Sequence, residues 1–301
     1  MEPGSLSDRA VRFIVNPVSG NGRTRRVLPR LVGVAKKLGV RFDLQLTEAP
    51  QHATELANEN TNEFDVVIAV GGDGTVNEVA TGAWKSKKVM GVIPTGTGND
   101  FVRAIGRLKS LHEYVHRAVA GKIKAIDVGT VCMDNREFVF VNGVGIGFDA
   151  EVARESLNFT RLKGISRYLV SVMRTLSKYK SAQLTIRLDD DVINQKSYLV
   201  AIGNGISAGG GFLLTPNAVL DDGALDACIV RDVSIPRVLR VIPSVLRGEH
   251  VKLPEVTMRR SSKVNIKSEI PVAVHRDGEI PTSRVTELDI TVTPRSLKII
   301  V

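Results

Sequence analysis

Apolar residues in the first 124 positions of the chain alternate between short continuous runs and helical spacing. Continuous runs such as 66–70 and 89–93 are typical of strands buried in a parallel sheet. Helical spacing is found between such runs, over 24–38, 52–60, 76–84 and 111–120. Because the two patterns alternate, the first part of the chain predicts a mostly parallel sheet covered by helices.

From residue 126 onward, the pattern changes to many short β-rich runs. These runs cover 128–131, 138–141, 183–188, 197–202, 225–230, 263–266, 272–275 and 288–292. Successive short strands of this kind are typical of an antiparallel β-sandwich. The change of pattern therefore predicts two domains, an α/β domain over 1–125 and a β-sandwich domain over 126–293.

The apolar run 66–70 ends in a glycine-rich loop that contains one acid. The loop reads Gly71-Gly72-Asp73-Gly74 and continues into Thr75, Val76, Asn77 and Glu78. Glycine lets backbone N–H groups approach an anion, and a helix that begins near Thr75 would point its positive end at the same place. Asp73 would repel a phosphate unless a divalent cation lay between them, so the loop indicates a magnesium-nucleotide site. Taken alone, the loop fits an ordinary glycine-rich turn equally well.

Two more loops of the same kind follow other apolar runs. Pro94-Thr95-Gly96-Thr97-Gly98-Asn99-Asp100 follows 89–93, and Asn16-Pro17-Val18-Ser19-Gly20-Asn21-Gly22 follows 11–15. Neighbouring strands of a parallel sheet end at the same edge, which is where open α/β sheets bind ligands. We therefore expect the three loops to meet at one edge of the sheet.

The composition favours a soluble protein with anionic partners. The chain has 41 Lys and Arg against 32 Asp and Glu, a formal net charge of +9, which suits an anionic membrane surface. Aromatic residues make up only 5% and do not alternate with basic ones, so we expect no nucleic-acid partner. No apolar run has membrane-spanning length, and residues 1–9 lack the apolar core of a signal peptide. We expect a cytoplasmic protein that contacts the membrane peripherally, and a homodimer is one assembly that the sequence leaves open.

One expected helix in the second domain has a basic face. Apolar residues recur at helical spacing at Ile165, Tyr168, Leu169, Val172, Met173, Leu176 and Tyr179. Basic residues fall on the opposite face, at Lys163, Arg167, Arg174 and Lys178. The helix either docks on lipid headgroups or packs its apolar stripe on the core with a solvated basic face.

Five motifs in this order carry a resemblance to a known family. They are NPVSGNG, GGDGTVNE, PTGTGNDF, DDGALD and RDGE, and they extend from about Arg12 to the C-terminus. Together they resemble the diacylglycerol kinase catalytic-domain family, in particular the soluble bacterial lipid kinases. The resemblance implies a doubly wound sheet similar to that of NAD kinases and phosphofructokinases, followed by the β-sandwich. It also implies that the final strand, 294–301, returns to the first domain.

The resemblance assigns a role to individual residues. The nucleotide would be held by Asn16, Pro17, Val18, Ser19, Gly20, Thr47, Gly72, Asp73, Gly74, Thr75, Val76, Asn77, Glu78 and Thr97. Asp73 and Asp100 would organise catalytic Mg²⁺, and Asp277 would be the general base. Glu279 would join a carboxylate network with these two acids of the first domain. Arg276 departs from the apolar residue expected before Asp277, and this departure bears on acceptor preference.

The remaining candidate residues lie in turns of the second domain. Paired acids and a glycine, as in Asp221-Asp222-Gly223, are often purely structural. In the resembled family this turn holds Mg²⁺, which implies ligation by the Asp222 side chain and by the carbonyls of Val219 and Ala224. The glycine-dense segments 142–149, 203–205 and 209–212 are expected as loops that line the acceptor cleft, or as tight β-bends.

These residues predict an ATP-dependent lipid kinase whose first acceptor is diacylglycerol. Positioning and charge neutralisation are the main tasks of a protein in phosphoryl transfer, and the loops and acids suit both. Three alternatives remain open at this point. The acceptor could be a sphingoid base, ceramide or phosphatidylglycerol, the chain could be an NAD kinase, or it could be a nucleotide- or lipid-sensing protein without turnover.

Overall fold

The structure is a computed structural model that describes residues 10–59, 63–159, 162, 164–280 and 284–301. The chain divides into two compact units. The first unit comprises Met1–Ile126 and Arg295–Val301, and the second comprises Asp127–Pro294. The domain limits expected from the sequence, 1–125 with 294–301 and 126–293, each differ from these limits by one residue.

The first unit is built on a parallel sheet. Its strands are β1 (Ala10–Val15), β2 (Arg41–Leu46), β3 (Val66–Gly71) and β4 (Val89–Pro94), in the order β2-β1-β3-β4. The last residues of β14 (Val285–Ile300) extend this sheet, because Ile299 pairs in parallel with Met90 of β4. The predicted parallel sheet is confirmed, and the end of the chain belongs to the first unit.

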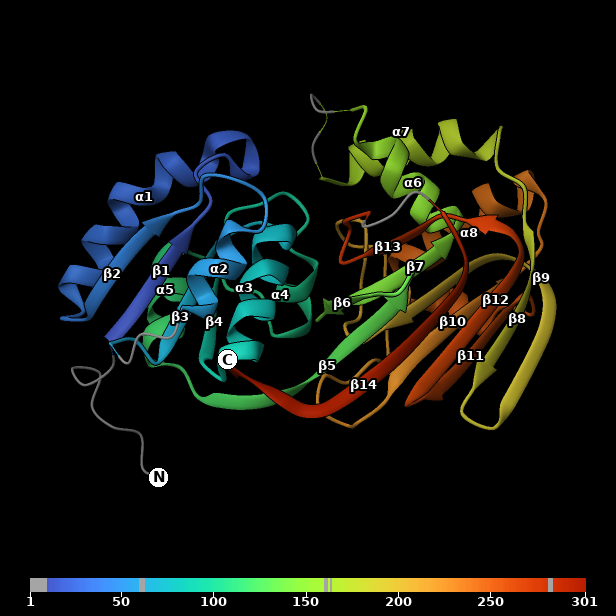
Figure 1. The fold of residues 1–301 in the computed structure, drawn as a ribbon. Helices are drawn as coiled ribbons and strands as arrows, with labels where there is room; N and C mark the ends of the chain where they lie inside the picture. The colour runs from blue at the N-terminus through green and yellow to red at the C-terminus, as the bar shows by residue number, and fades with distance from the viewer. Residues whose placement is uncertain (1–9, 60–62, 160–161, 163, 281–283) are drawn as a thin grey trace. The chain divides into compact units, whose positions relative to one another are not determined.

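Helices cover both faces of this sheet (Figure 1). Helices α1 (Ser19–Lys37) and α5 (Leu111–Ala120) pack together on one face, and α2 (His52–Asn58) packs on α3 (Asp73–Ser86) on the other. The short α4 (Asp100–Ala104) follows β4. Apolar side chains of β1 and β3, such as Phe13 and Ile68, form one core with Leu31 of α1 and Val115 of α5. The doubly wound arrangement that the alternating pattern predicted is therefore correct.

The second unit is an antiparallel β-sandwich, as predicted. Its strands are β5 (Ile123–Met133), β6 (Arg136–Phe140), β7 (Gly143–Gly147), β8 (Ala182–Leu188), β9 (Asp191–Gly203), β10 (Leu225–Arg231), β11 (Val256–Ser261), β12 (Lys263–Val272), β13 (Val274–Arg276) and β14. The long β9 belongs to both layers: its first half pairs with β8, and its second half lies between β7 and β10. Alternate residues of the strands in both layers, including Phe140, Ile186 and Ile229, form a single core.

Three helices and a 3₁₀ turn cover the outer face of β9 and β10. They are α6 (Phe148–Ser156), α7 (Gly164–Leu176), α8 (Ile235–Leu246) and the turn η2 (Glu249–Lys252). The predicted apolar stripe of α7 packs on this face through Val172 and Leu176, but Met173 is 54% exposed and was wrongly assigned to the stripe. Lys163 and the side chains of Ile165 and Arg167 lie outside the described part of the structure.

The glycine-dense segment 142–149 is a strand and a helix start, which excludes the loop, one of the two alternatives that the sequence left open. Residues 143–147 form β7, which pairs with β9 and β13. The glycines are needed because other groups fill the space beside the strand. A Cβ at Gly145 would lie 2.2 Å from His275 Nε2 and 2.4 Å from Asp149 Oδ2. Glycine content alone does not separate such a crowded strand from a loop.

Candidate active site

The three glycine-rich loops of the first unit meet at the carboxyl edge of its sheet, as predicted. The N–H groups of Thr95 and Gly96 both donate to the Gly71 carbonyl, at 2.8 and 3.1 Å. In chain order, the second loop is the one that follows β3. The Asn16 side chain reaches this loop and donates from Nδ2 to Thr75 Oγ1 at 3.1 Å. Loops that follow β1, β3 and β4 therefore form one continuous surface.

Glycine is required at this surface because backbones touch there. Gly20 has a φ of 60°, and a Cβ on it would lie 2.2 Å from the Thr95 carbonyl oxygen. A Cβ at Gly96 would lie 2.4 Å from the Cα of Gly72. The glycines thus let the loops pack against one another, in addition to the predicted approach of N–H groups to an anion. Gly72, Asp73 and Gly74 remain partly exposed at the start of α3.

Asp73 links the second loop, after β3, to the third loop, after β4. Its carboxylate accepts hydrogen bonds from the N–H groups of Asn99, at 2.8 Å, and Asp100, at 2.7 Å. A Cβ at Gly98 would lie 2.5 Å from Asp73 Oδ2, so Gly98 makes room for this contact. Asp73 therefore caps the first turn of α4, a role that the sequence analysis missed. Its role toward Mg²⁺ stays a prediction.

Asp100 lies at the same junction and is almost buried, with 7% of its surface exposed. Its Oδ1 is 3.5 Å from Arg103 Nε, one turn further along α4. In the same unit, the hydroxyl groups of Thr24 and Thr95 are 2.5 Å apart, and this hydrogen bond connects α1 to the loop after β4. The structure thus brings Asp73 and Asp100 together, as the sequence predicted.

The later residues of the GGDGTVNE motif face the protein interior. The side chains of Thr75, Val76 and Asn77 are buried, so the exposed part of this motif is limited to its first residues. Glu78 accepts a hydrogen bond from Ala53 N at 3.2 Å and thereby caps α2. The predicted nucleotide contact through the Glu78 side chain therefore competes with a structural role, because α2 has no side-chain cap of its own.

Four predicted nucleotide residues form the rim of this edge. Pro17 and Val18 follow β1, and Val18 is 75% exposed. Thr47 follows β2 and donates its N–H to the Val15 carbonyl at 2.9 Å. Thr97 is exposed in the third loop. All four lie beyond the ends of the parallel strands, where a bound ligand could reach them.

In the second unit, Asp277 anchors the turn between β6 and β7. Its carboxylate accepts three backbone hydrogen bonds, from Val141 and Asn142 at 3.0 Å and from Gly143 at 2.7 Å. The side chain is 8% exposed, and the residue has a left-handed φ of 45°. The sequence analysis did not foresee this structural role. The role of Asp277 as general base stays a prediction.

Arg276, the residue that departs from the family pattern, is buried in the second unit. It donates from Nη1 to the Val139 carbonyl at 3.1 Å, and its guanidinium lies over the Phe138 ring. Its Nη2 is 3.2 Å from Glu279 Oε2. The arginine therefore binds the Glu279 carboxylate across the turn. The expected network of Glu279 with Asp73 and Asp100 would join the two units and stays a prediction.

A buried polar cluster next to this turn was not predicted. Tyr168 donates its hydroxyl to Asp149 Oδ1 at 2.5 Å, and His275 Nε2 lies 2.7 Å from Asp149 Oδ2. Gly278 N donates to His275 Nδ1 at 3.3 Å, so the ring uses Nε2–H toward Asp149. Burial alone would raise the pKa of Asp149, but His275 and Tyr168 more than offset this, and the pKa lies below its usual value. The cluster orients the turn that carries Asp277.

The turn predicted to hold Mg²⁺ has suitable oxygens, but its carboxylate is already paired. Arg260 Nη2 donates to Asp222 Oδ2, and Ala224 N donates to Asp222 Oδ1 at 3.1 Å. One oxygen of the neighbouring Asp226 is buried without a hydrogen-bond partner in the described structure, and burial raises the pKa of that carboxyl. Oxygen donors of this type fit a hard cation. A cation at Asp222 would have to displace Arg260.

We predict that Mg²⁺ stabilises this protein through Asp222 and that Arg260 competes with it. A cation that binds only the folded state adds about 2.7 kcal/mol when its concentration is 100 times Kd. Thermal melting with and without MgCl₂, in the absence of nucleotide, measures the effect. Asp222→Ala should abolish the Mg²⁺-dependent rise in Tm, and Arg260→Gln should enlarge it. Equal Mg²⁺-dependent shifts in all three proteins would contradict a metal site at this turn.

An apolar pocket lies beside the buried cluster of the second unit. It has a volume of about 100 Å³ and lies between α7, α8 and the outer face of β9 and β10. Its apolar lining includes Phe212, Leu214 and Ile242, and Asp149 and Tyr168 contribute polar groups. Its apolar lining with a few polar groups is of the kind found in small-molecule sites, but its volume is below the roughly 300–1,000 Å³ that such sites usually have.

Comparison with known families covers nearly the whole chain. Residues 10–131 match the family described as the diacylglycerol kinase catalytic domain. Residues 142–301 match the YegS C-terminal NAD kinase beta sandwich-like domain. The chain is 31% identical over 275 residues to a Staphylococcus epidermidis protein named diacylglycerol kinase, and the match covers 90% of this chain and 86% of that protein. The chain belongs to the diacylglycerol kinase family.

Further relatives agree with this assignment. A Staphylococcus saprophyticus protein of the same name is 30% identical, with 90% of this chain and 89% of that protein covered. A crystal structure of a Bacillus anthracis protein, provisionally described as a diacylglycerol kinase, superimposes with a TM-score of 0.82 at 26% identity and covers 100% of this chain and 97% of that one. Membership of this family indicates that the chain is a lipid kinase. The α/β fold of its first unit and the β-sandwich of its second unit are those that the motifs implied.

Proposed function

We propose that this lipid kinase transfers the γ-phosphoryl group of ATP to the hydroxyl of diacylglycerol and so forms phosphatidic acid. The observation that carries the proposal is the junction of the three glycine-rich loops, where Asp73 binds the backbone of the third loop beside Asp100. Partly exposed glycines at the start of α3 and two adjacent carboxylates are the groups that a magnesium-bound triphosphate requires.

Each group at this junction has a defined task in the proposal. The N–H groups at the start of α3 bind phosphate oxygens, and Val18, Thr47 and Thr97 contact the rest of the nucleotide at the rim. Asp73 and Asp100 hold Mg²⁺, which neutralises charge on the transferred phosphoryl group when it is bound. Because Asp73 is fixed by two backbone hydrogen bonds, its remaining lone pairs point in a defined direction.

The acceptor side of the proposal lies in the second unit. The apolar pocket, of about 100 Å³, would take a few methylene groups of an acyl chain, and the Asp149–Tyr168 pair offers polar groups to the glycerol end of the lipid. Asp277 accepts the proton of the attacking hydroxyl, as an aspartate does in protein kinases. Glu279 and Arg276 hold the turn that presents this carboxylate.

The proposed function is tested by incubating the protein with ATP labelled at the γ-phosphate, Mg²⁺ and a panel of acceptors in mixed micelles. The panel contains diacylglycerol, sphingosine, ceramide and phosphatidylglycerol, with NAD as a soluble competitor. Labelled phosphatidic acid as the main product supports the proposal. Preferential labelling of another lipid or of NAD would reassign the acceptor, and no labelled product with any acceptor would contradict the proposed reaction.

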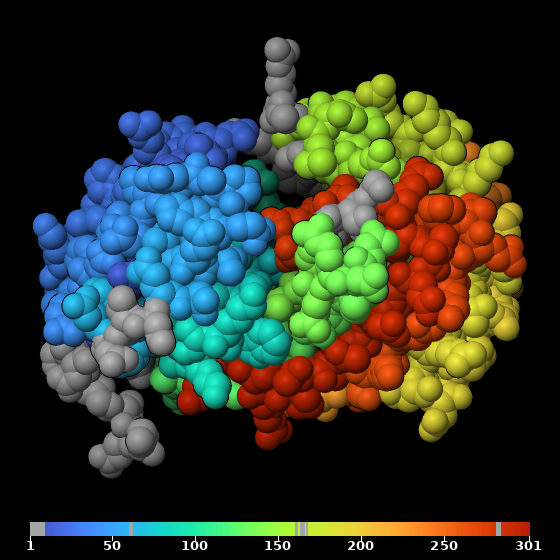
Figure 2. Space-filling model, in the orientation of Figure 1, coloured from blue at the N-terminus to red at the C-terminus, as the bar shows by residue number. Residues whose placement is uncertain are grey.

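We further propose that the second unit contacts anionic membranes through the basic face of α7. Figure 2 shows α7, in yellow-green, at the surface of this unit. Arg174 is exposed and its guanidinium lies 3.5 Å from Glu155, an ion pair that is largely screened in water. Lys178 lies just beyond the C-terminal end of α7. Within the described residues, no helix is long and apolar enough to cross a membrane.

Charge reversal on α7 should weaken vesicle binding. We expect the double variant Arg174→Glu, Lys178→Glu to bind vesicles rich in phosphatidylglycerol roughly tenfold or more weakly, since each basic residue near an anionic surface contributes about 1 kcal/mol. Co-sedimentation at increasing salt measures the effect. The control is Arg187→Glu, Lys267→Glu, which makes the same charge change on β8 and β12. Equal losses in both double variants would show that only net charge matters.

A further inference from the structure

A basic pocket lies in the first unit, away from the three glycine-rich loops. It has a volume of about 430 Å³ and is lined by Trp84, Lys85, Lys87, Lys88, Ser296 and Lys298. Residues 84–88 end α3 and lead into the start of β4, and residues 296 and 298 precede and follow Leu297 in the part of β14 that joins the sheet. Because the strands are parallel, the start of β4 lies at the opposite edge of the sheet from the proposed nucleotide site.

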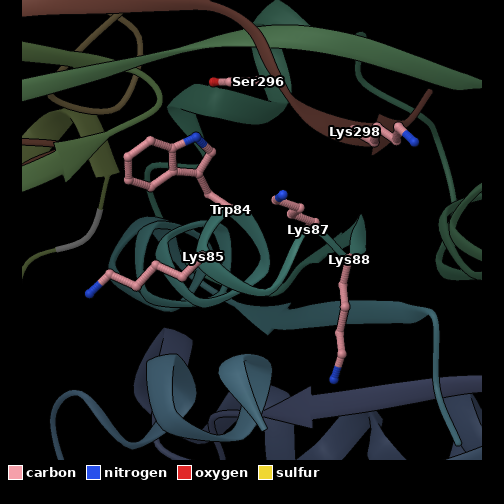
Figure 3. Close-up of a pocket in the computed structure, with 6 residues that line it drawn as sticks. All are labelled: Trp84, Lys85, Lys87, Lys88, Ser296 and Lys298. Carbon is pink, nitrogen blue, oxygen red and sulfur yellow. The ribbon is translucent and has the colours of Figure 1, made fainter. Parts of the chain in front are cut away.

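Three of the lining residues face a common space (Figure 3). The Trp84 indole and the side chain of Lys87 lie next to each other, with Ser296 and Lys298 on the strand across from them. The side chains of Lys85, Lys88 and Lys298 extend away from this space. The Lys88 ammonium is bound elsewhere, because it donates to the Glu59 carbonyl. The pocket therefore presents the Lys87 ammonium and the Trp84 indole, and Lys298 lines it from the strand across.

The positive charge of this pocket is not neutralised by protein carboxylates. None of the six lining residues is acidic. Within the part of the chain that the structure describes, neither Lys87 nor Lys298 forms an ion pair. Lys88 lies near charges of both signs, because burial and Arg12 lower its pKa while Glu59 and Asp65 oppose this change. Such a concave site attracts anions.

The position of Lys87 is also unusual for a lysine. It has a left-handed φ of 58°, at the end of α3, where glycine is the usual residue. Lysines near a helix end often serve the last carbonyl groups, but here Ala83 O and Trp84 O already accept hydrogen bonds from the N–H groups of Lys87 and Lys88. The Lys87 ammonium is therefore available for a ligand.

We propose that this pocket binds a phosphate monoester. The Lys87 ammonium binds the phosphate dianion, the exposed Lys298 side chain turns toward the same phosphate, and the Trp84 indole packs on the organic part of the ligand. A soluble phosphorylated metabolite and a phosphorylated lipid headgroup share this chemistry. The site is separate from the glycine-rich loops, so it adds a second phosphate-binding site to the protein and does not depend on the proposed reaction.

Trp84 makes this proposal directly measurable, because it is the only tryptophan of the chain. Intrinsic fluorescence of the full chain is titrated in two arms, one with glycerol 3-phosphate and one with phosphatidylcholine vesicles that contain phosphatidate. Sodium chloride at matched ionic strength is the blank in both. We expect a saturable change in emission in at least one arm, and the arm that responds identifies the source of the phosphate.

The variants separate this site from diffuse charge. Lys87→Gln with Lys298→Gln should weaken binding about 10- to 100-fold, the usual range for lost charge-assisted hydrogen bonds. Lys85→Gln, which removes a lysine that points away, should bind like the unmodified protein. Circular dichroism melting checks that the variants are folded, and basal kinase activity should not change. No saturable response in either arm, or an equal loss in Lys85→Gln, would overturn the proposal.

Discussion

Asp73→Asn is expected to lower kcat about 10³-fold or more, because the charge that holds Mg²⁺ at the triphosphate is lost. The asparagine keeps one acceptor oxygen, so one of the N–H groups of Asn99 and Asp100 keeps its partner and the other faces the amide NH₂. It is therefore a milder change than Asp73→Ala, which would leave both donors without a partner at about 1–3 kcal/mol each. Steady-state kinetics at saturating ATP and several Mg²⁺ concentrations measure the effect.

A matched control separates the loss of metal from the loss of a helix cap. Ser110 caps α5 in the same unit by accepting a hydrogen bond from Glu113 N at 3.2 Å. Ser110→Ala should lower stability by about 1 kcal/mol and leave kcat unchanged. If Asp73→Asn melts no lower than Ser110→Ala and yet retains near-normal turnover, Asp73 is only a cap and the proposed magnesium site is wrong.

The sequence predicted the loops well because their chemistry and their topology agree. Glycines after apolar runs indicate turns, and parallel strands bring those turns to one edge, so the meeting of Gly20, Gly72 and Gly96 could be foreseen. The contacts made there could not. That Asp73 would cap α4 and Glu78 would cap α2 depends on the packing of α2, α3 and α4, which local patterns do not contain.

The second unit was harder to predict because its key contacts join distant segments. Asp149 and His275 are 126 positions apart along the chain, and glycine-rich β7 could not be distinguished from a loop because the groups that crowd Gly145 come from these two residues. His275 directly precedes the RDGE motif, and Asp149 ends a glycine-rich run. Both residues can be seen in the sequence next to a motif. The residues around them, however, do not distinguish a buried polar pair from an ordinary strand end.

The same difficulty bears on Asp277, for which we expect a large effect from Asp277→Asn. As the proposed general base, Asp277 should contribute about 10² to 10⁴ to kcat, with little change in the affinity for ATP. The structure adds a second effect. Three backbone N–H groups donate to this carboxylate, and an amide presents only one oxygen to them, so stability should also fall, by about 1–3 kcal/mol.

A second aspartate of the same unit provides the control. Asp189 also has a left-handed φ, of 49°, and its carboxylate accepts hydrogen bonds from the N–H groups of Ser262 and Lys263. Asp189→Asn should therefore reproduce the loss of an anchored turn without a loss of chemistry. Both variants are compared by thermal melting and by kcat with diacylglycerol.

The outcome of that comparison decides what Asp277 does. If Asp277→Asn loses much more kcat than Asp189→Asn at a temperature at which both variants are fully folded, the carboxylate takes part in the reaction. If kcat recovers when the assay temperature is lowered well below the melting transition, Asp277 is a positioning residue and its proposed role as base is wrong. A defect confined to the KM for ATP would make it a nucleotide or metal ligand, because a base acts on the acceptor hydroxyl and leaves nucleotide binding unchanged.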